Sequence, residues 1–213
     1  MVLIYRALYP EVGLPNRATA DTDAAIETAV AASGKIHALL QAAGYEAEAG
    51  NSYRRGNRQI DLLTGNYAGK FKTVLLGGRA FDSAPGVQLA LDAPPLLVEL
   101  RVRLLTGGSI ELLAPIPPLD VAVCLKALSY NLRLAPRDLV DLYHLLLIAN
   151  HELESGVKPW SLAERARGDR LKAQQGLQTL TDNLALRSTQ QIQDVDRVKL
   201  AALIKRLVFS PHR

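Results

Sequence analysis

The sequence predicts a mixed α/β protein, in which a small mixed β-sheet domain over residues 1–117 is followed by an all-α domain over residues 118–213. Short apolar segments broken by glycine and proline pairs fill the first half, which is typical of strands joined by turns. After Pro117-Pro118 the strand signals disappear and apolar residues recur at helical spacing. The boundary is therefore placed where the type of element changes.

The first half is predicted to contain short strands and few helices. Ser33 and Gly44 bound a predicted helix over 33–43, and the opening residues MVLIYRAL are also expected to be helical. Strands are expected over 21–30, 45–49, 58–64, 72–76, 88–91, 96–106 and 109–116, separated by glycines and prolines such as Gly65. The pair Gly107-Gly108 should join the last two strands into a hairpin, and one face of its first strand is apolar.

The second half is predicted to contain four helices, over residues 119–134, 136–150, 160–187 and 190–208. Pro136 falls at the start of the second helix, where its missing N–H costs nothing. Two apolar stripes should face the core, formed by Leu139, Leu142, Tyr143 and Leu146 and by Leu200, Leu203, Ile204 and Leu207.

Composition limits the classes of function. The single cysteine, Cys124, excludes an intramolecular disulfide and a thiolate metal site, and it favours a cytoplasmic location. No apolar run approaches the roughly 20 residues that span a bilayer, so no membrane association is expected. The formal net charge of +4 favours a polyanionic partner, either RNA or nucleotide phosphates, although a slightly basic protein without such a partner has the same charge.

Three aspartates form the main candidate site. Asp21 and Asp23 are two residues apart on a predicted strand, so their carboxylates should share one face. Asp61 stands among apolar neighbours, where a charge is tolerated if it is paired or binds a metal. If the two strands are neighbours, the three carboxylates converge on a site for Mg²⁺, which prefers oxygen ligands. The alternative is that the aspartates are merely solvated.

Two segments resemble a known family. The string RATADTDAAI resembles the R-x-T-x-D-x-D signature of the polymerase-β-like nucleotidyltransferase superfamily. The segment from Lys126 to His144, KALSYNLRLAPRDLVDLYH, is similar to the helical block of its AbiEii/MenT group, the toxins of type IV toxin–antitoxin systems. The resemblance covers about residues 1–150. It implies a nucleotidyltransferase fold for the first domain, with a second, helical domain that completes the site.

The resemblance also implies roles for particular residues. Asp21 and Asp23 would bind Mg²⁺, as one or two ions, and Lys126 on the first helix after the sheet would contact the phosphates of an NTP substrate. An aspartate on the next helix would also be required. Asp141 fits this position best, and Asp138, one turn earlier, is the alternative.

By the same resemblance, Thr19 and Arg137 would contribute to nucleotide and phosphate binding. The implied reaction transfers a nucleoside monophosphate from an NTP to an acceptor, with the tRNA 3′ end as the expected acceptor and a cognate antitoxin as the expected protein partner. Two alternatives stay open. The acceptor could be a protein or a small molecule, or the chain could be a catalytically silent relative that binds or regulates.

The sequence departs from the family at one feature. Family members carry a Gly-Gly or Gly-Ser pair just before the first helix, where backbone amides hold phosphate. No such pair precedes Asp21 here. We expect the reading frame to continue upstream of Met1 and to encode an apolar strand that ends in these glycines; without it, the silent alternative gains weight.

Overall fold

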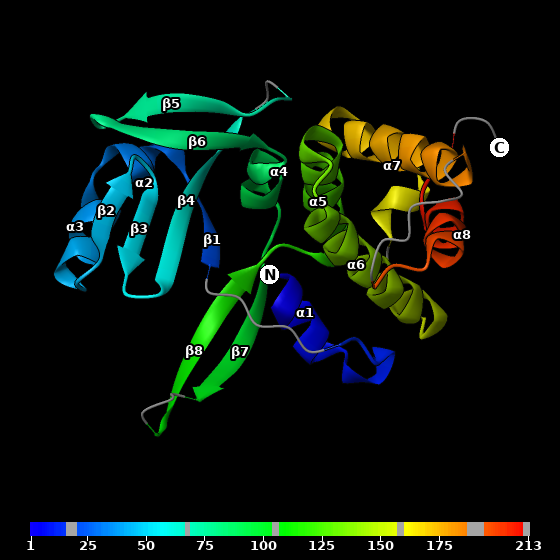
Figure 1. Ribbon diagram of the computed structural model, residues 1–213, viewed down its shortest axis with the longest axis horizontal. Helices are drawn as coiled ribbons and strands as arrows, with labels where there is room; N and C mark the ends of the chain where they lie inside the picture. Colours follow the sequence, from blue (N-terminus) through cyan, green and yellow to red (C-terminus); the bar gives the residue numbers. More distant parts are fainter. Residues whose placement is uncertain (16–20, 67–68, 104–106, 157–159, 187–193, 211–213) are drawn as a thin grey trace.

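The computed structural model describes residues 1–15, 21–66, 69–103, 107–156, 160–186 and 194–210. The protein is a mixed α/β molecule in which a curled sheet lies beside a bundle of helices, with a separate hairpin projecting from the junction (Figure 1). None of the described helices is long and apolar enough to cross a membrane.

The described residues form one six-stranded sheet. Its strands are β1 (Asp21–Ile26), β2 (Glu46–Ala49), β3 (Ser52–Arg55), β4 (Arg58–Asn66), β5 (Lys72–Leu76) and β6 (Arg79–Pro85). The long strand β4 is central. Strand β1 pairs parallel to it along one edge. Along the other edge, β3 pairs antiparallel to the first part of β4, and β6 pairs parallel to its last part. The antiparallel strands β2 and β5 complete the sheet.

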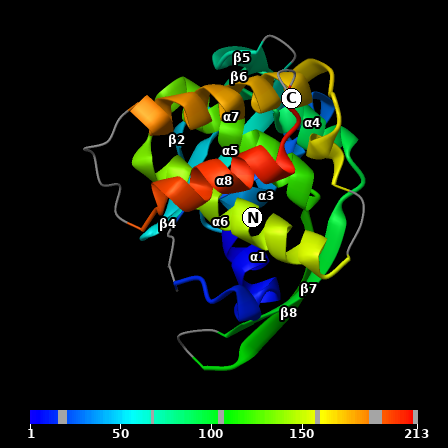
Figure 2. The ribbon, with the colours of Figure 1, turned by 90° about the vertical axis from the view of Figure 1, so that its right-hand side faces the viewer.

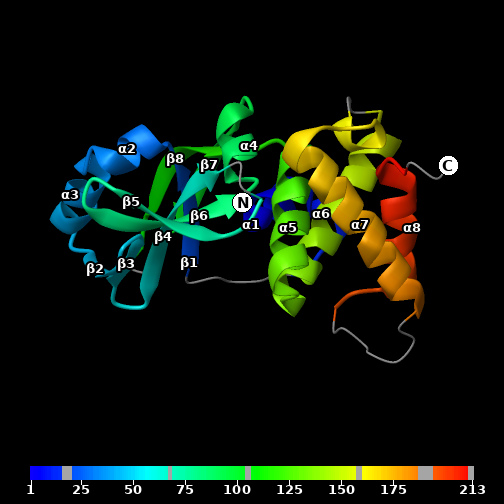
Figure 3. The same ribbon diagram turned by 90° about the horizontal axis from the view of Figure 1, so that it is seen from above.

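One face of this sheet is covered by two short helices, α2 (Thr28–Ala32) and α3 (Lys35–Ala42), which Figure 3 shows beside strands β2 and β5. Alternation along the strands directs Ile26, Leu62 and Phe81 into a small core with Tyr53 and Ala31. The residues that alternate with these on β1 and β4 therefore lie on the opposite face, which these helices leave open.

The second half is helical, with α5 (Leu119–Arg133), α6 (Pro136–Glu154), α7 (Gly168–Leu186) and α8 (Arg197–Leu207) packed together (Figure 2). A short 3₁₀ helix, η2 (Ser161–Ala163), precedes α7. The two predicted apolar stripes are both buried. Trp160 joins this core and donates a hydrogen bond from its indole N–H to the carbonyl of Leu207.

Elements from the first half belong to the same helical core. The first helix, α1 (Val2–Leu8), is followed by a 3₁₀ turn, η1 (Pro10–Val12), and packs on α6. Tyr5 is buried there and donates a hydrogen bond of 2.8 Å to the carbonyl oxygen of Pro117. The hairpin of β7 (Leu96–Arg103) and β8 (Ser109–Ile116) buries Val98 and Ile116 in this core. Residues from before residue 117 therefore pack in the same core as the helices that follow it.

A short helix, α4 (Val87–Asp92), connects the sheet to the bundle. It contacts β1, β4 and β6 on one side and α5 on the other. Gly65 allows the close approach to β4, because a Cβ there would lie 2.7 Å from the Cα of Gln88. Gly86, with φ of 81°, turns the chain into α4 directly against Leu128.

Several sequence predictions need correction. Residues 88–91 form part of helix α4, because the left-handed Gly86 starts a helical turn that fits between sheet and bundle. The strand predicted over 21–30 ends at Ile26, and α2 follows it. Gly65 lies inside β4 and does not end it. Strands β3 and β6 were not predicted, since each carries few apolar residues and is held by backbone pairing.

The last two helices are shorter than predicted. Residues 161–163 form the separate 3₁₀ turn, and α7 begins only at Gly168. Helix α8 begins at Arg197, where the Asp196 carboxylate caps it by accepting a hydrogen bond of 2.9 Å from the Lys199 N–H. By contrast, the predicted hairpin, the helix after Pro136 and the first helix are confirmed.

Candidate functional site

Two of the three predicted aspartates are brought into register by the sheet. Strands β1 and β4 are parallel neighbours, and Asp23 lies directly opposite Asp61. Asp21 precedes Asp23 by two residues, so the backbone places it on the same face, although its side chain lies outside the described part of the structure. This acidic face, defined by Asp21, Asp23 and Asp61, is the one that α2 and α3 leave uncovered.

The Asp61 carboxylate is oriented by two neutral donors. Ser52, its neighbour on β3, donates a hydrogen bond of 2.6 Å to Oδ1. The Gln59 amide, two residues earlier on β4, donates to Oδ2 at 2.9 Å and to Oδ1 at 3.1 Å. Hydrogen bonds from neutral groups fix the direction of the carboxylate without cancelling its charge.

A second cluster forms where α5 packs against α6. The Lys126 ammonium lies 2.8 Å from Oδ2 of Asp141 and 3.5 Å from Oδ1 of Asp138. The Arg133 guanidinium lies 2.8 Å from the other oxygen of Asp138. The side chains of Asp138 and Asp141 are only 5% and 8% exposed, and that of Lys126 is 21% exposed. The two aspartates therefore hold the lysine at the edge of the bundle.

Local sequence explains why these three residues meet. Lys126 lies near the middle of α5, and the chain reverses at Leu134, which adopts the left-handed conformation with φ of 51°. Pro136 then starts α6, and Asp138 and Asp141, three residues apart, share one face of its first turns. The turn places that face opposite Lys126.

The N-terminus lies between β1 and α5, the two elements that carry Asp23 and Lys126 (Figures 1 and 3). The pKa of the Met1 amino group is below its usual value because of burial and the charge of Lys126, while the carboxylates of Asp23 and Asp141 act in the opposite direction.

The acidic face has the donor chemistry of a site for a hard divalent cation. Asp23 and Asp61 supply carboxylate oxygens from adjacent strands, and the donors to Asp61 are uncharged. Among the described side chains, no group of three His, Cys, Asp or Glu residues is close enough to hold a metal ion. The carboxylate of Asp21, the third predicted ligand, is not among those side chains.

Two predicted site residues remain, Thr19 and Arg137. Thr19 falls outside the described residues. Arg137 is exposed on the first turn of α6, next to Asp138 in the sequence.

Sequence reasoning missed three residues that orient the clusters, namely Ser52, Gln59 and Arg133. Gln59 could have been found from its spacing, because it lies two residues before Asp61 on the same strand face. Ser52 and Arg133 gave no such signal, since their partners are set by strand pairing and by the turn after α5.

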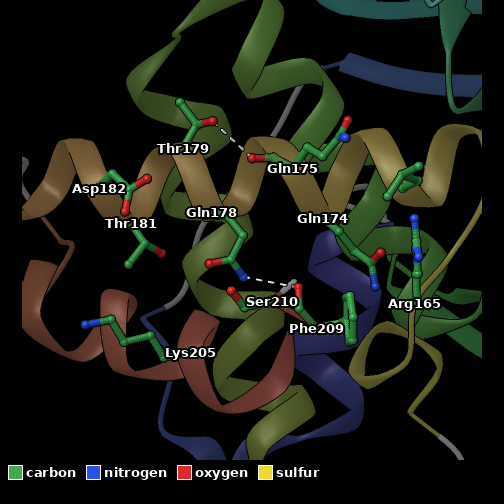
Figure 4. A pocket seen from close by; sticks show the side chains of 11 residues that line it. Arg165, Gln174, Gln175, Gln178, Thr179, Thr181, Asp182, Lys205, Phe209 and Ser210 are labelled. Carbon is green, nitrogen blue, oxygen red and sulfur yellow. Dashed lines mark hydrogen bonds between the residues drawn. The ribbon is translucent and has the colours of Figure 1, made fainter. Parts of the chain in front are cut away.

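A groove on the described surface lies away from both clusters. This groove, of about 790 Å³, runs between α7 and the end of the chain after α8 (Figure 4). Most of the residues that line it are polar, and Gln174 and Gln178 there donate hydrogen bonds to backbone carbonyls. None of the residues of the two charged clusters lines this groove, so it contributes nothing to the candidate site.

Comparisons of the chain with protein-family models, with curated proteins and with solved structures gave no match.

Proposed function

We propose that this protein is a metal-dependent nucleotidyltransferase of the AbiEii/MenT type, which transfers a nucleoside monophosphate from an NTP to an acceptor. The observation that supports the proposal most directly is the approach of two clusters from distant parts of the chain. Asp23 and Asp61 come from the sheet, Lys126 and Asp141 come from the bundle, and helix α4 contacts both β1 and α5, the elements that carry Asp23 and Lys126.

In the proposed reaction, a hydroxyl oxygen of the acceptor forms a bond to the α-phosphorus of the NTP. The bond from that phosphorus to the bridging oxygen breaks, pyrophosphate leaves, and the hydroxyl proton passes to a carboxylate of the acidic face. Asp21, Asp23 and Asp61 would hold a divalent cation, which neutralises phosphate charge when bound. Lys126 would bind the phosphates and offset the charge that develops on the leaving pyrophosphate.

Asp138 and Asp141 act through Lys126. Their nearly buried carboxylates limit the directions in which the ammonium can point. Such preorganisation is useful in phosphoryl transfer, where catalysis consists mainly of positioning and charge stabilisation. Arg133 shares Asp138 and leaves Asp141 as the closer partner of the lysine.

The acceptor we propose is the 3′ end of tRNA, with a cognate antitoxin as regulator. The net charge of +4 is compatible with a polyanionic acceptor. A second candidate function is a non-catalytic binding or regulatory role. It is favoured by one observation, namely that the Lys126 ammonium is already engaged by two carboxylates of its own chain.

A transfer assay tests the proposal. The protein is incubated with each of the four α-labelled NTPs, Mg²⁺ and total RNA, and label is sought in the tRNA fraction, in protein and in small molecules. Asp23→Ala should abolish labelling and leave the far-UV circular dichroism spectrum unchanged, because Asp23 is exposed. Glu46→Gln, at an exposed carboxylate of β2, is the matched control and should retain full activity.

Removal of the metal provides a second criterion. EDTA should stop the transfer, and added Mg²⁺ should restore it. Label in protein or in a small molecule would keep the enzyme class and reject tRNA as the acceptor. Full activity of Asp23→Ala, or activity unaffected by EDTA, would overturn the proposal. No labelling with any NTP, from a protein that still binds RNA, would favour the non-catalytic role.

A further inference from the structure

The β7–β8 hairpin carries more of the exposed large apolar residues than any other element described. Figures 1 and 2 show it projecting from the body in two perpendicular views. Its base is anchored in the helical core, but several large apolar side chains along it are 42–57% exposed: Leu96, Leu97, Val102, Ile110, Leu112 and Leu113. An isolated two-stranded hairpin is marginally stable in water, and exposed apolar clusters mark interaction sites.

The two outer edges of the hairpin differ. In the described residues, β7 and β8 pair only with each other, so both outer edges lack a strand partner. Pro115 has no N–H and lies opposite Leu97, so this pair fits the non-hydrogen-bonded type. Pro115 therefore removes a donor from the outer edge of β8, which blunts that edge against pairing.

The same reasoning determines which backbone N–H and C=O groups β7 presents at its outer edge. Pair types alternate along an antiparallel ladder, so Leu97, Glu99, Arg101 and Arg103 all belong to non-hydrogen-bonded pairs. Their N–H and C=O groups point outward and form a complete row. The outer edge of β7 is thus the one that can accept another antiparallel strand.

We propose that a second copy of this chain pairs with it, β7 against β7, about a two-fold axis at Leu100. In this register Glu99 lies opposite Arg101 of the second copy, and the outward groups of both strands meet in hydrogen-bonded pairs. A shift of the axis to residue 99 would place Glu99 opposite itself, and a shift to residue 101 would place Arg101 opposite itself. Like charges directly opposite are destabilising, so the Leu100 register is favoured over these two.

This pairing also brings apolar side chains of the two copies next to one another. Val98, Leu100 and Val102 lie on one face of β7 together with Ile110 and Leu112 of β8. In the Leu100 register, Leu100 meets its own copy and Val98 lies opposite Val102 of the other copy. Two hairpins would then form one four-stranded sheet with a continuous apolar face. Because the strands are antiparallel, the two bodies would lie at opposite ends of that sheet.

A backbone substitution tests the edge directly. The N–H of Glu99 points outward, so Glu99→Pro removes a hydrogen bond to the second copy without breaking the β7–β8 ladder. Leu113→Pro is the matched control, because Leu113 lies opposite Glu99 and its N–H points to the outer edge of β8. Analytical ultracentrifugation should give twice the mass of one chain for the native protein and for Leu113→Pro, and the mass of one chain for Glu99→Pro.

Charge exchange tests the register. Glu99→Arg and Arg101→Glu each place like charges opposite across the axis, so each variant alone should sediment as a monomer. Arg101 also forms an ion pair with Glu111 of its own hairpin, so the mixture of the two variants is the arm that tests the register. An equimolar mixture should recover the dimer, since the two arginines of one variant then face the two glutamates of the other. A monomeric native protein, a dimer that persists in Glu99→Pro, or a mixture that stays monomeric would each overturn the proposal. Circular dichroism spectra confirm that every variant is folded.

Discussion

At the scale of single residues, the cluster around Lys126 combines two nearly buried carboxylates with one partly buried ammonium. Asp138 and Asp141 are almost fully buried, and a buried carboxylate is tolerated when a cation or hydrogen bonds compensate it. Lys126 supplies the charge for both, while Arg133 approaches Asp138 from a position that is 54% exposed. The lysine therefore matters for stability, independently of any role with a substrate.

Replacing Lys126 should affect both stability and activity. We expect Lys126→Met to lower the free energy of unfolding by about 3 kcal/mol, because it leaves two nearly buried carboxylates without their shared cation. Arg133→Gln, the control, should cost less than about 1 kcal/mol because solvent screens this exposed guanidinium. Urea unfolding measures both. If the chain is a nucleotidyltransferase, Lys126→Met should also lower turnover on the order of 100-fold, and equal stability losses in the two variants would contradict this account.

At the scale of elements, the turn between α5 and α6 decides where the cluster forms. Leu134 ends α5 in the left-handed conformation, which is costly for a residue with a Cβ, and its side chain is 67% exposed. Helices commonly end on glycine at this position, because glycine adopts the conformation without strain. The turn therefore holds a strained leucine in order to bring Asp138 and Asp141 against α5.

Two glycine substitutions should have opposite effects on stability. Leu134→Gly should raise the free energy of unfolding by about 1 kcal/mol, because it relieves left-handed strain without removing buried contacts. Leu132→Gly, two residues earlier and inside α5, should lower it by about 1 kcal/mol, since glycine is a poor helix former. Thermal and urea unfolding check both signs. A loss of stability in Leu134→Gly would show that its side chain contributes packing that outweighs the strain.

At the scale of the whole molecule, the two halves of the chain share one core. Tyr5 on α1 is fully buried among residues of the bundle, far from them in the sequence. The sheet has a separate, smaller core around Tyr53 and Phe81. Trp160, the single tryptophan of the chain, lies in the helical core, so its fluorescence reports on that core alone.

Substitutions of Tyr5 should therefore shift the unfolding transition seen by Trp160. We expect Tyr5→Ala to cost about 3–5 kcal/mol, as for other large aromatic residues in cores. Tyr5→Phe should cost about 1 kcal/mol, through loss of the hydrogen bond to Pro117. Leu39→Ala, at a leucine of α3 that is 68% exposed, is the control and should change stability by less than about 0.5 kcal/mol. An unchanged Trp160 transition in Tyr5→Ala would show that α1 is not part of the cooperative unit.

Some elements of the fold could be predicted from the sequence and others could not. The hairpin at Gly107-Gly108 and the apolar stripes of α6 and α8 follow from local periodicity, and all are confirmed. The short strands β3 and β6 and the helix α4 do not follow from local periodicity. Backbone pairing determines the two strands, and packing between the sheet and the bundle determines the helix. The roles assigned to Asp21, Asp23 and Lys126 remain predictions.

The sequence by itself determined which residue types could carry chemistry, the spacing that places Asp21 and Asp23 on one strand face, and the change from strands to helices at Pro117-Pro118. These features depend on neighbours a few residues away, which local periodicity records. Only the tertiary structure decided that Asp61 lies in register with Asp23, that Lys126 is held by Asp138 and Asp141, and that α1 packs in the helical core. The physical reason is that strand register and helix packing are set by contacts between residues far apart in the chain, whose partners no local pattern identifies.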